Sequence, residues 1–352
     1  MKRGLIVSLG SMWWIGGCTP LPPGVRAPTE VWAVDAPGPI GSSIVTADSA
    51  RATSASGISA AVDSWIALDT VSFRPTLVSR SAGSRRGADE GATLSRPLAG
   101  VRRRLSIVTS FQGSRYHPDV IRGLTESSDA VALAAGSIAS LLSASETRVV
   151  IVDFQEMTAA DIQILADVSR AIADSARSRG IPTVAMMIPA ADSSGYPARI
   201  LARTADLMLV KLFPEHGVTT PAGAIVSPSW FTRRLGLRAS EAGVNRIVAG
   251  IPADGLIWDA RGGARRIAYL EALRLATEAN TRLVRDPASG NLHAVSNRDG
   301  WEIWVADHEL IERLIAEGRR LGVTRFALFG LDGADPEILE RLPGLVIGSP
   351  GR

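Results

Sequence analysis

The chain has 352 residues, of which 46% are hydrophobic and 21% are charged, with 34 glycines and 20 prolines. This profile is typical of a globular protein and excludes a disordered, collagenous or multi-span membrane chain. Lys and Arg total 38 against 35 for Asp and Glu, and removing Lys2 and Arg3 leaves 36 against 35. A polyanion-binding protein normally carries a basic excess on one face, so no nucleic-acid partner is expected.

The N-terminal segment has the organisation of an export signal. Lys2 and Arg3 form a charged start, residues 4–14 are apolar, and Ile-Gly-Gly-Cys follows, ending at Cys18. The apolar stretch is too short to span a bilayer and precedes small residues, as in a signal peptide. The Ile-Gly-Gly-Cys run resembles the lipobox of bacterial lipoproteins, where cleavage precedes a cysteine whose thiol is acylated. The alternative is an ordinary buried cysteine.

We therefore expect residues 1–17 to be a lipoprotein signal peptide. Residues 18–30 would be the lipidated Cys18 and a Pro- and Gly-rich tether, and residues 31–345 would form the folded domain. The expected location is the bacterial cell envelope, lipid-anchored on the periplasmic or outer-membrane side, with the membrane reached through lipid on Cys18. Because Cys18 is the only cysteine, the domain has no disulfide and depends on its core.

From residue 31 onward, short apolar runs alternate with helical patterns. Near-continuous apolar runs are expected of parallel strands that are buried on both faces. Eight β/α repeats favour a (β/α)₈ TIM barrel, an α/β fold, over the alternative of an open doubly wound sheet. The eight predicted strands are residues 31–34, 65–68, 105–108, 149–152, 184–188, 207–210, 247–251 and 326–329.

Capping signals and breaks in the pattern complete the expected architecture. Thr158 with Asp161 predicts a capping box at the start of one helix, and Asp307 predicts the N-cap of another. Residues 79–104 are polar and indicate a solvated loop, with contact to an anionic polymer as the alternative. Turn signals within residues 281–305 predict a small β-rich insertion between strands seven and eight.

In a barrel of this kind, function lies at the C-terminal ends of the strands. Strand four ends in Asp153-Phe154-Gln155-Glu156, and a two-residue period turns Asp153 and Gln155 toward the barrel mouth. A carboxylate at the inner end of an apolar strand is costly unless it is paired or functional. The alternative for Asp153 is a helix N-cap or a loop carboxylate.

Several segments, in register with the predicted barrel, resemble family-18 glycoside hydrolases. The fourth-strand segment is similar to the family signature, an apolar run followed by Asp-aromatic-Glu. The later segments fit best the branch of spore-cortex hydrolases and related envelope glycosidases, and the resemblance covers about residues 31–341. The matching segments are residues 149–157, 205–216, 221–230, 250–255, 304–307 and 329–333.

This resemblance implies substrate-assisted hydrolysis of β-linked N-acetylglucosamine polymers without a cofactor. Asp153 stands where the family has the carboxylate that orients the substrate's acetamido group, an exception to the two-carboxylate scheme. The partner implied is a glycan, either peptidoglycan or a chitin-like oligosaccharide. A strand-six tyrosine and a strand-eight tryptophan usually complete the substrate site.

The sequence departs from that pattern at the most demanding position. Gln155 stands where the family has its acid glutamate, and an amide has no titratable proton for a role worth roughly 10²–10⁴-fold. Phe213 replaces the tyrosine and loses its hydroxyl, while Phe329 replaces the tryptophan and keeps an aromatic face. The fold carries over from the resemblance, whereas catalysis does not carry over residue by residue.

Four further residues are candidates. Glu156 follows the acid position, and a β-bulge could turn it inward as an acid; otherwise it is a salt-bridged or helix-start carboxylate. Glu215 and His216 follow strand six and could bind substrate or act as an acid/base pair, with polar packing at the rim as the alternative. Trp258 could stack on a sugar ring, with a core or loop-anchoring role as the alternative.

No metal is expected from the histidines, because their spacing matches no ligand motif. No Gly-x-Ser-x-Gly elbow indicates a serine hydrolase. The histidines are His117, His216, His293 and His308.

Three functions remain open at this point. The first is a lipid-anchored, glycosidase-like protein that binds a glycan with impaired hydrolysis, because Gln155 replaces the acid. The second is an active glycosidase that uses Glu156 as its acid. The third is a non-catalytic envelope scaffold that binds protein.

Overall fold

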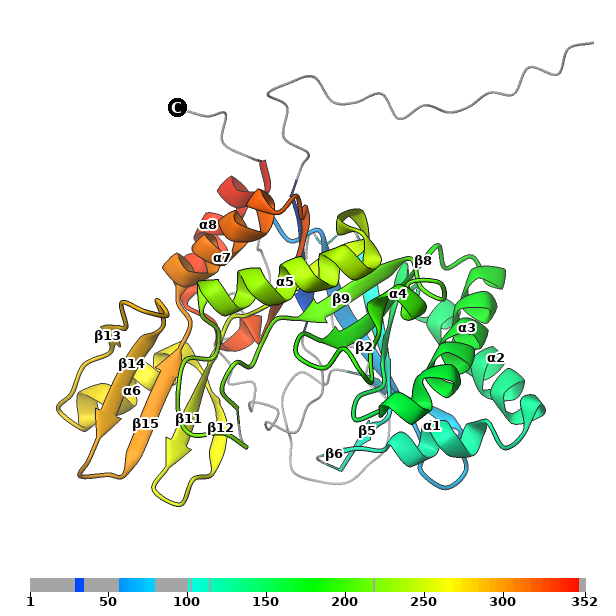
Figure 1. Ribbon diagram of the computed structural model, residues 1–352, viewed down its shortest axis with the longest axis horizontal. Helices are drawn as coiled ribbons and strands as arrows, with labels where there is room; N and C mark the ends of the chain where they lie inside the picture. The colour runs from blue at the N-terminus through cyan, green and yellow to red at the C-terminus, as the bar shows by residue number, and fades with distance from the viewer. Residues whose placement is uncertain are drawn as a thin grey trace, which may run out of the picture.

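The computed structural model describes residues 29–34, 57–79, 101, 103–113, 115–217 and 219–347. The predicted signal peptide, Cys18 and nearly all of the tether lie outside these residues, as does most of the polar stretch at 79–104. Figure 1 shows the arrangement of the helices and strands.

Eight parallel strands close into a barrel. Closure occurs because β1 (Glu30–Val34) pairs with both β2 (Ala60–Leu68) and β16 (Arg325–Phe329). The predicted (β/α)₈ barrel is confirmed, and the open-sheet alternative is wrong. Between β2 and β16 the sheet follows the order β4 (Arg103–Thr109), β7 (Val149–Asp153), β8 (Thr183–Pro189), β9 (Leu207–Lys211) and β10 (Ile247–Pro252).

Each of the eight predicted strand segments lies in a strand of this barrel. The largest boundary difference is in β2, which begins at Ala60 rather than at residue 65. Its register against β4 shifts between Val62 and Ser64. Such an irregularity adds a residue to one strand and breaks the side-chain alternation. The apolar run visible in the sequence is therefore only the second half of the strand.

Alternation along the strands separates two apolar layers. One set of side chains fills the barrel interior, and the other packs beneath the surrounding helices. On β7, Val149 and Ile151 belong to the interior, whereas Val150 and Val152 belong to the outer layer. The same alternation places the last residue of β7, Asp153, on the interior side.

Helices cover the outside of the barrel (Figure 1). Their bounds are α1 (Pro118–Leu124), α2 (Ser128–Ala144), α3 (Ile162–Ser178), α4 (Ala198–Leu201), α5 (Pro228–Ala242), α7 (His308–Arg320) and α8 (Pro336–Ile347). Asp307 caps α7 as predicted. The predicted capping box of Thr158 and Asp161 is present, but a short 3₁₀ turn, Ala159–Asp161, comes before α3.

None of the described helices is by itself long and apolar enough to cross a membrane. The pair α1 and α2 meets the length and composition test together, with a bend of 117° between them.

A second sheet follows β10 and lies beside the barrel (Figure 1). It has the antiparallel order β12-β11-β15-β14-β13 and packs on α6 (Tyr269–Glu278). The predicted insertion at about 281–305 holds three of its strands, and the sheet itself begins earlier, at Gly255. The bounds are β11 (Gly255–Asp259), β12 (Ala264–Ile267), β13 (Val284–Arg285), β14 (Leu292–Ser296) and β15 (Trp301–Val305).

Two smaller pairings remain. β3 (Pro75–Ser79) runs antiparallel to the second half of β2. β5 (Phe111–Gln112) and β6 (Arg115–Tyr116) form a hairpin after β4. This hairpin matters for the site, because it carries Tyr116 to the C-terminal end of the barrel.

We predict that Asp161 stabilises the fold through its links to α1 and to the start of α3. Its buried carboxylate accepts hydrogen bonds from Arg122 at 2.8 and 2.7 Å and from the Thr158 amide at 2.8 Å. Asp161→Ala should lower the free energy of unfolding by about 2 kcal/mol in urea denaturation. Asp167→Ala, an exposed ion-paired residue on α3, should cost about 0–1 kcal/mol.

The same contribution should depend on pH. The Arg122 hydrogen bonds hold the pKa of Asp161 well below its usual range. A carboxyl whose pKa is lower in the folded state than in the unfolded state stabilises the fold at pH values above the unfolded-state pKa of about 3.9. This stabilisation is lost as the pH falls toward the folded-state pKa. The difference between the native protein and Asp161→Ala should therefore shrink below about pH 4. An unchanged difference would contradict this assignment.

Candidate functional site

Asp153 is the central residue at the mouth of the barrel. Its side chain is 0% exposed. Gln155 Nε2 donates a hydrogen bond to Asp153 Oδ1 at 2.7 Å, and the Tyr116 hydroxyl donates to Oδ2 at 3.0 Å. Burial raises the pKa of Asp153, while the Lys211 charge and the two hydrogen bonds act in the opposite direction. The predicted pair of Asp153 and Gln155 thus lies together on the interior side.

The amide of Gln155 determines what this pair can do chemically. Gln155 is buried, and its Nε2 donates a second hydrogen bond to the Met187 carbonyl at 3.3 Å. A carboxyl group in the same place could contact Asp153 at this distance only by sharing a proton, since two carboxylates repel each other. The amide makes the contact without a titratable proton. It therefore positions Asp153 but offers no acid to a substrate.

Two residues of the site were absent from the sequence-based candidates. Tyr116 lies on β6, a two-residue strand outside the barrel, and burial together with Asp153 raises the pKa of its hydroxyl. Lys211 ends β9 in line with the interior residues Leu207 and Leu209. The two-residue period could have found Lys211, and so could its chemistry, because it is one of only two lysines in the chain.

Two aromatic rings lie beside this polar group. Phe213 and Phe329 contact edge to face, with ring centroids 5.0 Å apart. Gly250 on β10 makes room for the Phe329 ring, since a Cβ there would lie 3.0 Å from that ring and 2.7 Å from the Val210 carbonyl. Both predicted aromatic residues are therefore brought to the barrel mouth. Phe329 is buried and Phe213 is partly exposed.

Glu156 follows in a tight turn. The register of β7 against β4 is continuous to the pair Thr109 and Asp153, so the bulge that would turn Glu156 inward does not lie within β7. Glu156 instead has a φ of +62°, in the left-handed region, and its side chain is exposed. The Tyr196 hydroxyl closes this turn by accepting from the Met157 amide at 2.9 Å and donating to the Phe154 carbonyl at 2.8 Å.

Glu215 and His216 are engaged in packing after β9. The Glu215 carboxylate accepts a hydrogen bond from the Ser227 amide at 2.7 Å, next to the start of α5. His216 lies over Gly223, where an added Cβ would be 2.7 Å from its ring. Its Nδ1 is buried and hydrogen-bonds no other described residue. These contacts hold the β9–α5 loop against the helix.

Trp258 connects the barrel mouth with the second sheet. It is 4% exposed and packs with Ile225 and Leu256, and Phe213 and Trp304 contact the same cluster. Its indole Nε1 hydrogen-bonds none of the described residues. The ring faces of Trp258 are therefore covered in this structure.

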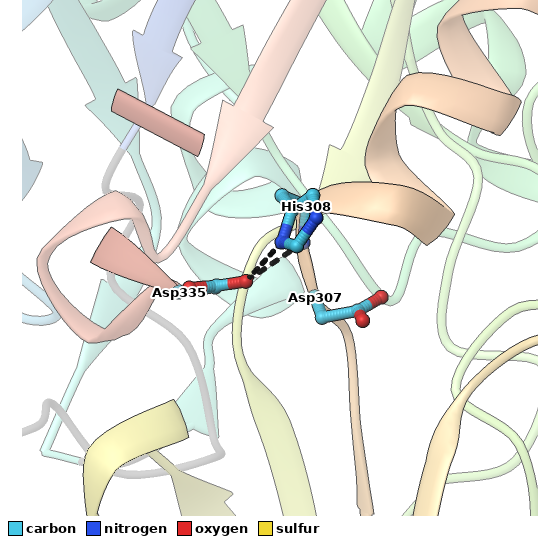
Figure 2. Close-up of side chains that lie close together, drawn as sticks. All are labelled: Asp307, His308 and Asp335. Atoms are coloured by element: carbon cyan, nitrogen blue, oxygen red, sulfur yellow. Dashed lines mark hydrogen bonds and ion pairs between the residues drawn. The ribbon is translucent and has the colours of Figure 1, made fainter. Parts of the chain in front are cut away.

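Among the described residues, Asp307, His308 and Asp335 bring one potential metal-ligand atom each to within 4.8 Å of one another (Figure 2). His308 Nδ1 lies 2.7 Å from Asp335 Oδ2, and Asp335 also accepts from the His308 amide at 3.1 Å. Asp307 caps α7 through the Leu310 amide and pairs with Arg285. These contacts at the starts of α7 and α8 account for the cluster without a bound ion.

We predict that the Tyr196 hydroxyl stabilises the turn that carries Gln155 and Glu156. Tyr196→Phe leaves the Met157 amide and the Phe154 carbonyl without their partner and should lower the free energy of unfolding by about 1–3 kcal/mol. Tyr269→Phe is the control, because its hydroxyl hydrogen-bonds none of the described residues, and it should change stability by less than about 0.5 kcal/mol. Equal effects of the two variants in urea denaturation would contradict this role.

The sequence comparisons find a relative that matches over a short stretch. No family model matches the chain. A stretch of 64 residues, 18% of this chain, is 30% identical to the uncharacterized glycosylase YvbX of Bacillus subtilis strain 168. The match spans only 19% of that relative's length.

Solved structures share the architecture over most of the chain. A chitinase of Chromobacterium violaceum has a TM-score of 0.72 at 15% identity, with 91% of this chain and 99% of that chain covered. The spore cortex-lytic enzyme SleL of Bacillus megaterium has a TM-score of 0.71 at 13% identity, with 89% and 73% covered. A Glu-to-Gln mutant of the tobacco class V chitinase, in complex with NAG4, has a TM-score of 0.68 at 13% identity, with 92% and 100% covered. The expected resemblance is thus confirmed at the level of the fold: this chain has the barrel of chitinases and spore cortex-lytic enzymes.

Proposed function

We propose that this protein is a lipid-anchored, glycoside-hydrolase-like protein that binds an N-acetylglucosamine-containing glycan with impaired hydrolysis. The observation that carries this proposal is the 2.7 Å hydrogen bond from Gln155 Nε2 to Asp153 Oδ1. It keeps the Asp153 carboxylate in place for a ligand and puts an amide where an acid would be needed. The glycan is peptidoglycan or a chitin-like oligosaccharide.

Three features support glycan binding. The barrel is shared with chitinases, one of them in complex with NAG4. A carboxylate, a tyrosine and an amide converge at the C-terminal end of the strands, where barrels of this kind bind their ligands. The partly exposed Phe213 adds an aromatic ring, a common contact for the apolar face of a sugar.

The loss of the acid is tested by restoring it. In Gln155→Glu the new carboxyl must share a proton with Asp153. This raises the pKa of the new glutamate, which can then donate a proton to the substrate. We expect this variant to cleave chitotetraose or peptidoglycan fragments about 10²–10⁴-fold faster than the native protein, with products read by mass spectrometry. Gln163→Glu, the same substitution at an exposed position on α3, should leave the native rate unchanged.

Other outcomes of this experiment decide between the functions. Efficient cleavage by the native protein would overturn impaired hydrolysis, and loss of that cleavage in Glu156→Ala would make Glu156 the acid. If neither glycan binds to the native protein in calorimetry, glycan recognition is wrong and a protein-binding scaffold replaces it.

Membrane attachment is a separate part of the proposal and rests on residues 1–18 of the sequence. The location proposed is the bacterial envelope, on the periplasmic or outer-membrane side. Cys18→Ser should abolish incorporation of a labelled fatty acid and move the protein from the membrane fraction to the soluble fraction. Ser8→Ala, a change within the apolar stretch, should leave both unchanged. Unchanged labelling of Cys18→Ser would exclude lipidation at this residue.

A further inference from the structure

The amine of Lys211 is a cation with unused hydrogen-bond donors. Lys211 ends β9, facing the barrel interior, and its register partners are Gly250 and Pro189. Its Nζ lies 5.7 Å from the centroid of the Phe213 ring. Within the described part of the chain, no hydrogen bond or ion pair at 4.0 Å or less reaches this amine. An ammonium group has three donors, so a ligand at the mouth could engage all of them.

The carboxylate that attracts Lys211, Asp153, already has hydrogen-bond donors. Both Asp153 oxygens accept hydrogen bonds from other side chains, Oδ1 from Gln155 and Oδ2 from Tyr116. A second cation, Arg266 of β12, acts on Lys211 by repulsion and is itself paired with Asp254. The attraction from Asp153 acts through space only.

These surroundings leave the charged form of Lys211 poorly stabilised. Burial, together with Arg266, lowers the pKa of the Lys211 amine, and Asp153 opposes this effect. A buried charge is costly until a partner of opposite sign and a hydrogen bond compensate it. An anionic group bound beside Lys211 would supply both and would offset the repulsion from Arg266.

We propose that the barrel mouth binds a glycan with a free sugar carboxylate, which pairs with Lys211 beside Arg266. This inference rests on the proposed function and narrows its ligand to an acidic sugar. The chemistry is shared by the lactyl group of N-acetylmuramic acid and by a hexuronic acid. A muramic acid whose carboxyl is amide-linked to a peptide has lost this charge, so a muramic acid ligand would have to be free of its peptide.

The test compares three disaccharides by calorimetry on the full chain. They are N-acetylglucosaminyl-N-acetylmuramic acid, an N-acetylglucosamine–glucuronic acid disaccharide, and neutral chitobiose. A charge-assisted hydrogen bond predicts that at least one acidic disaccharide binds about tenfold or more tightly than chitobiose. The tighter of the two acids identifies the source of the carboxylate.

Variants locate the effect at one side chain. Lys211→Met should remove the preference for the acidic sugar, so that the acidic disaccharide and chitobiose bind this variant with affinities within about twofold of each other. Arg265→Met is the matched control: Arg265 lies on the same strand as Arg266, is exposed and pairs with Glu271 on α6. It should keep the preference. If Lys211→Met does not fold, the methyl ester of the acidic disaccharide tests the same contact with the native protein, and it should bind like chitobiose.

The pH dependence gives a second readout. The pKa of Lys211 is depressed in the protein without ligand. Above this pKa the amine is neutral, so binding of a carboxylate must be accompanied by uptake of a proton. Affinity for the acidic disaccharide should therefore fall with rising pH more steeply than affinity for chitobiose. Asp153, Tyr116 and Arg266 are the other charged or titratable groups around Lys211, and they are the same in the pH series with the acidic disaccharide and in the series with chitobiose. The difference between the two series therefore reports the protonation of the Lys211 amine.

The failures are distinguishable. Chitobiose that binds as tightly as both acids, or a preference that survives in Lys211→Met, overturns the acidic-sugar inference and leaves glycan binding in place. Absence of binding by all three disaccharides overturns the proposed function, and this inference falls with it.

Discussion

A carboxylate with no exposure to solvent, placed at the mouth of an apolar barrel, is the constraint on which the site depends. An ionised carboxyl in such a place needs donors and a nearby positive charge. Asp153 accepts hydrogen bonds from Gln155 and Tyr116, and the positive charge of Lys211 attracts it without a hydrogen bond. These partners come from the β7 exit, the β5–β6 hairpin and the end of β9. The neighbouring strands β4, β7, β8 and β9 must therefore pair before the charge is compensated.

Gln155 and Lys211 set the charge at the barrel mouth together with Asp153. Gln155 contributes an uncharged amide, and Lys211 adds a cation to an interior otherwise built of residues such as Leu209 and Val248. A site with two carboxyls favours proton transfer, because their repulsion raises the pKa of one of them. A site with one carboxylate, one amide and one ammonium favours recognition, and this difference underlies both proposals.

The loops around the mouth supply rigidity more than chemistry. Glu215 binds the Ser227 amide near the start of α5, and Asp307 and Asp335 serve the starts of α7 and α8. Tyr196 holds both ends of the turn in which Glu156 has a positive φ. A non-glycine residue in this region costs about 1–3 kcal/mol unless its surroundings determine it. The hydrogen bonds of Tyr196 hold the turn in this conformation, and the turn in turn sets the position of Gln155.

The amino-acid sequence by itself determined the eight barrel strands and the inward direction of Asp153 and Gln155. Parallel strands buried on both faces leave continuous apolar runs, and a strand has a period of two, so both features are local. The start of the second sheet at Gly255 was not predicted from the sequence, because β11 and β12 are short and β12 carries charged residues. The same two-residue period also gives the inward direction of Lys211. Tyr116 and the turn at Glu156 were decided by the tertiary structure alone. Each depends on contacts between segments far apart in the chain, such as the 37 residues between Tyr116 and Asp153, which the pairing of β4 with β7 brings within hydrogen-bonding distance.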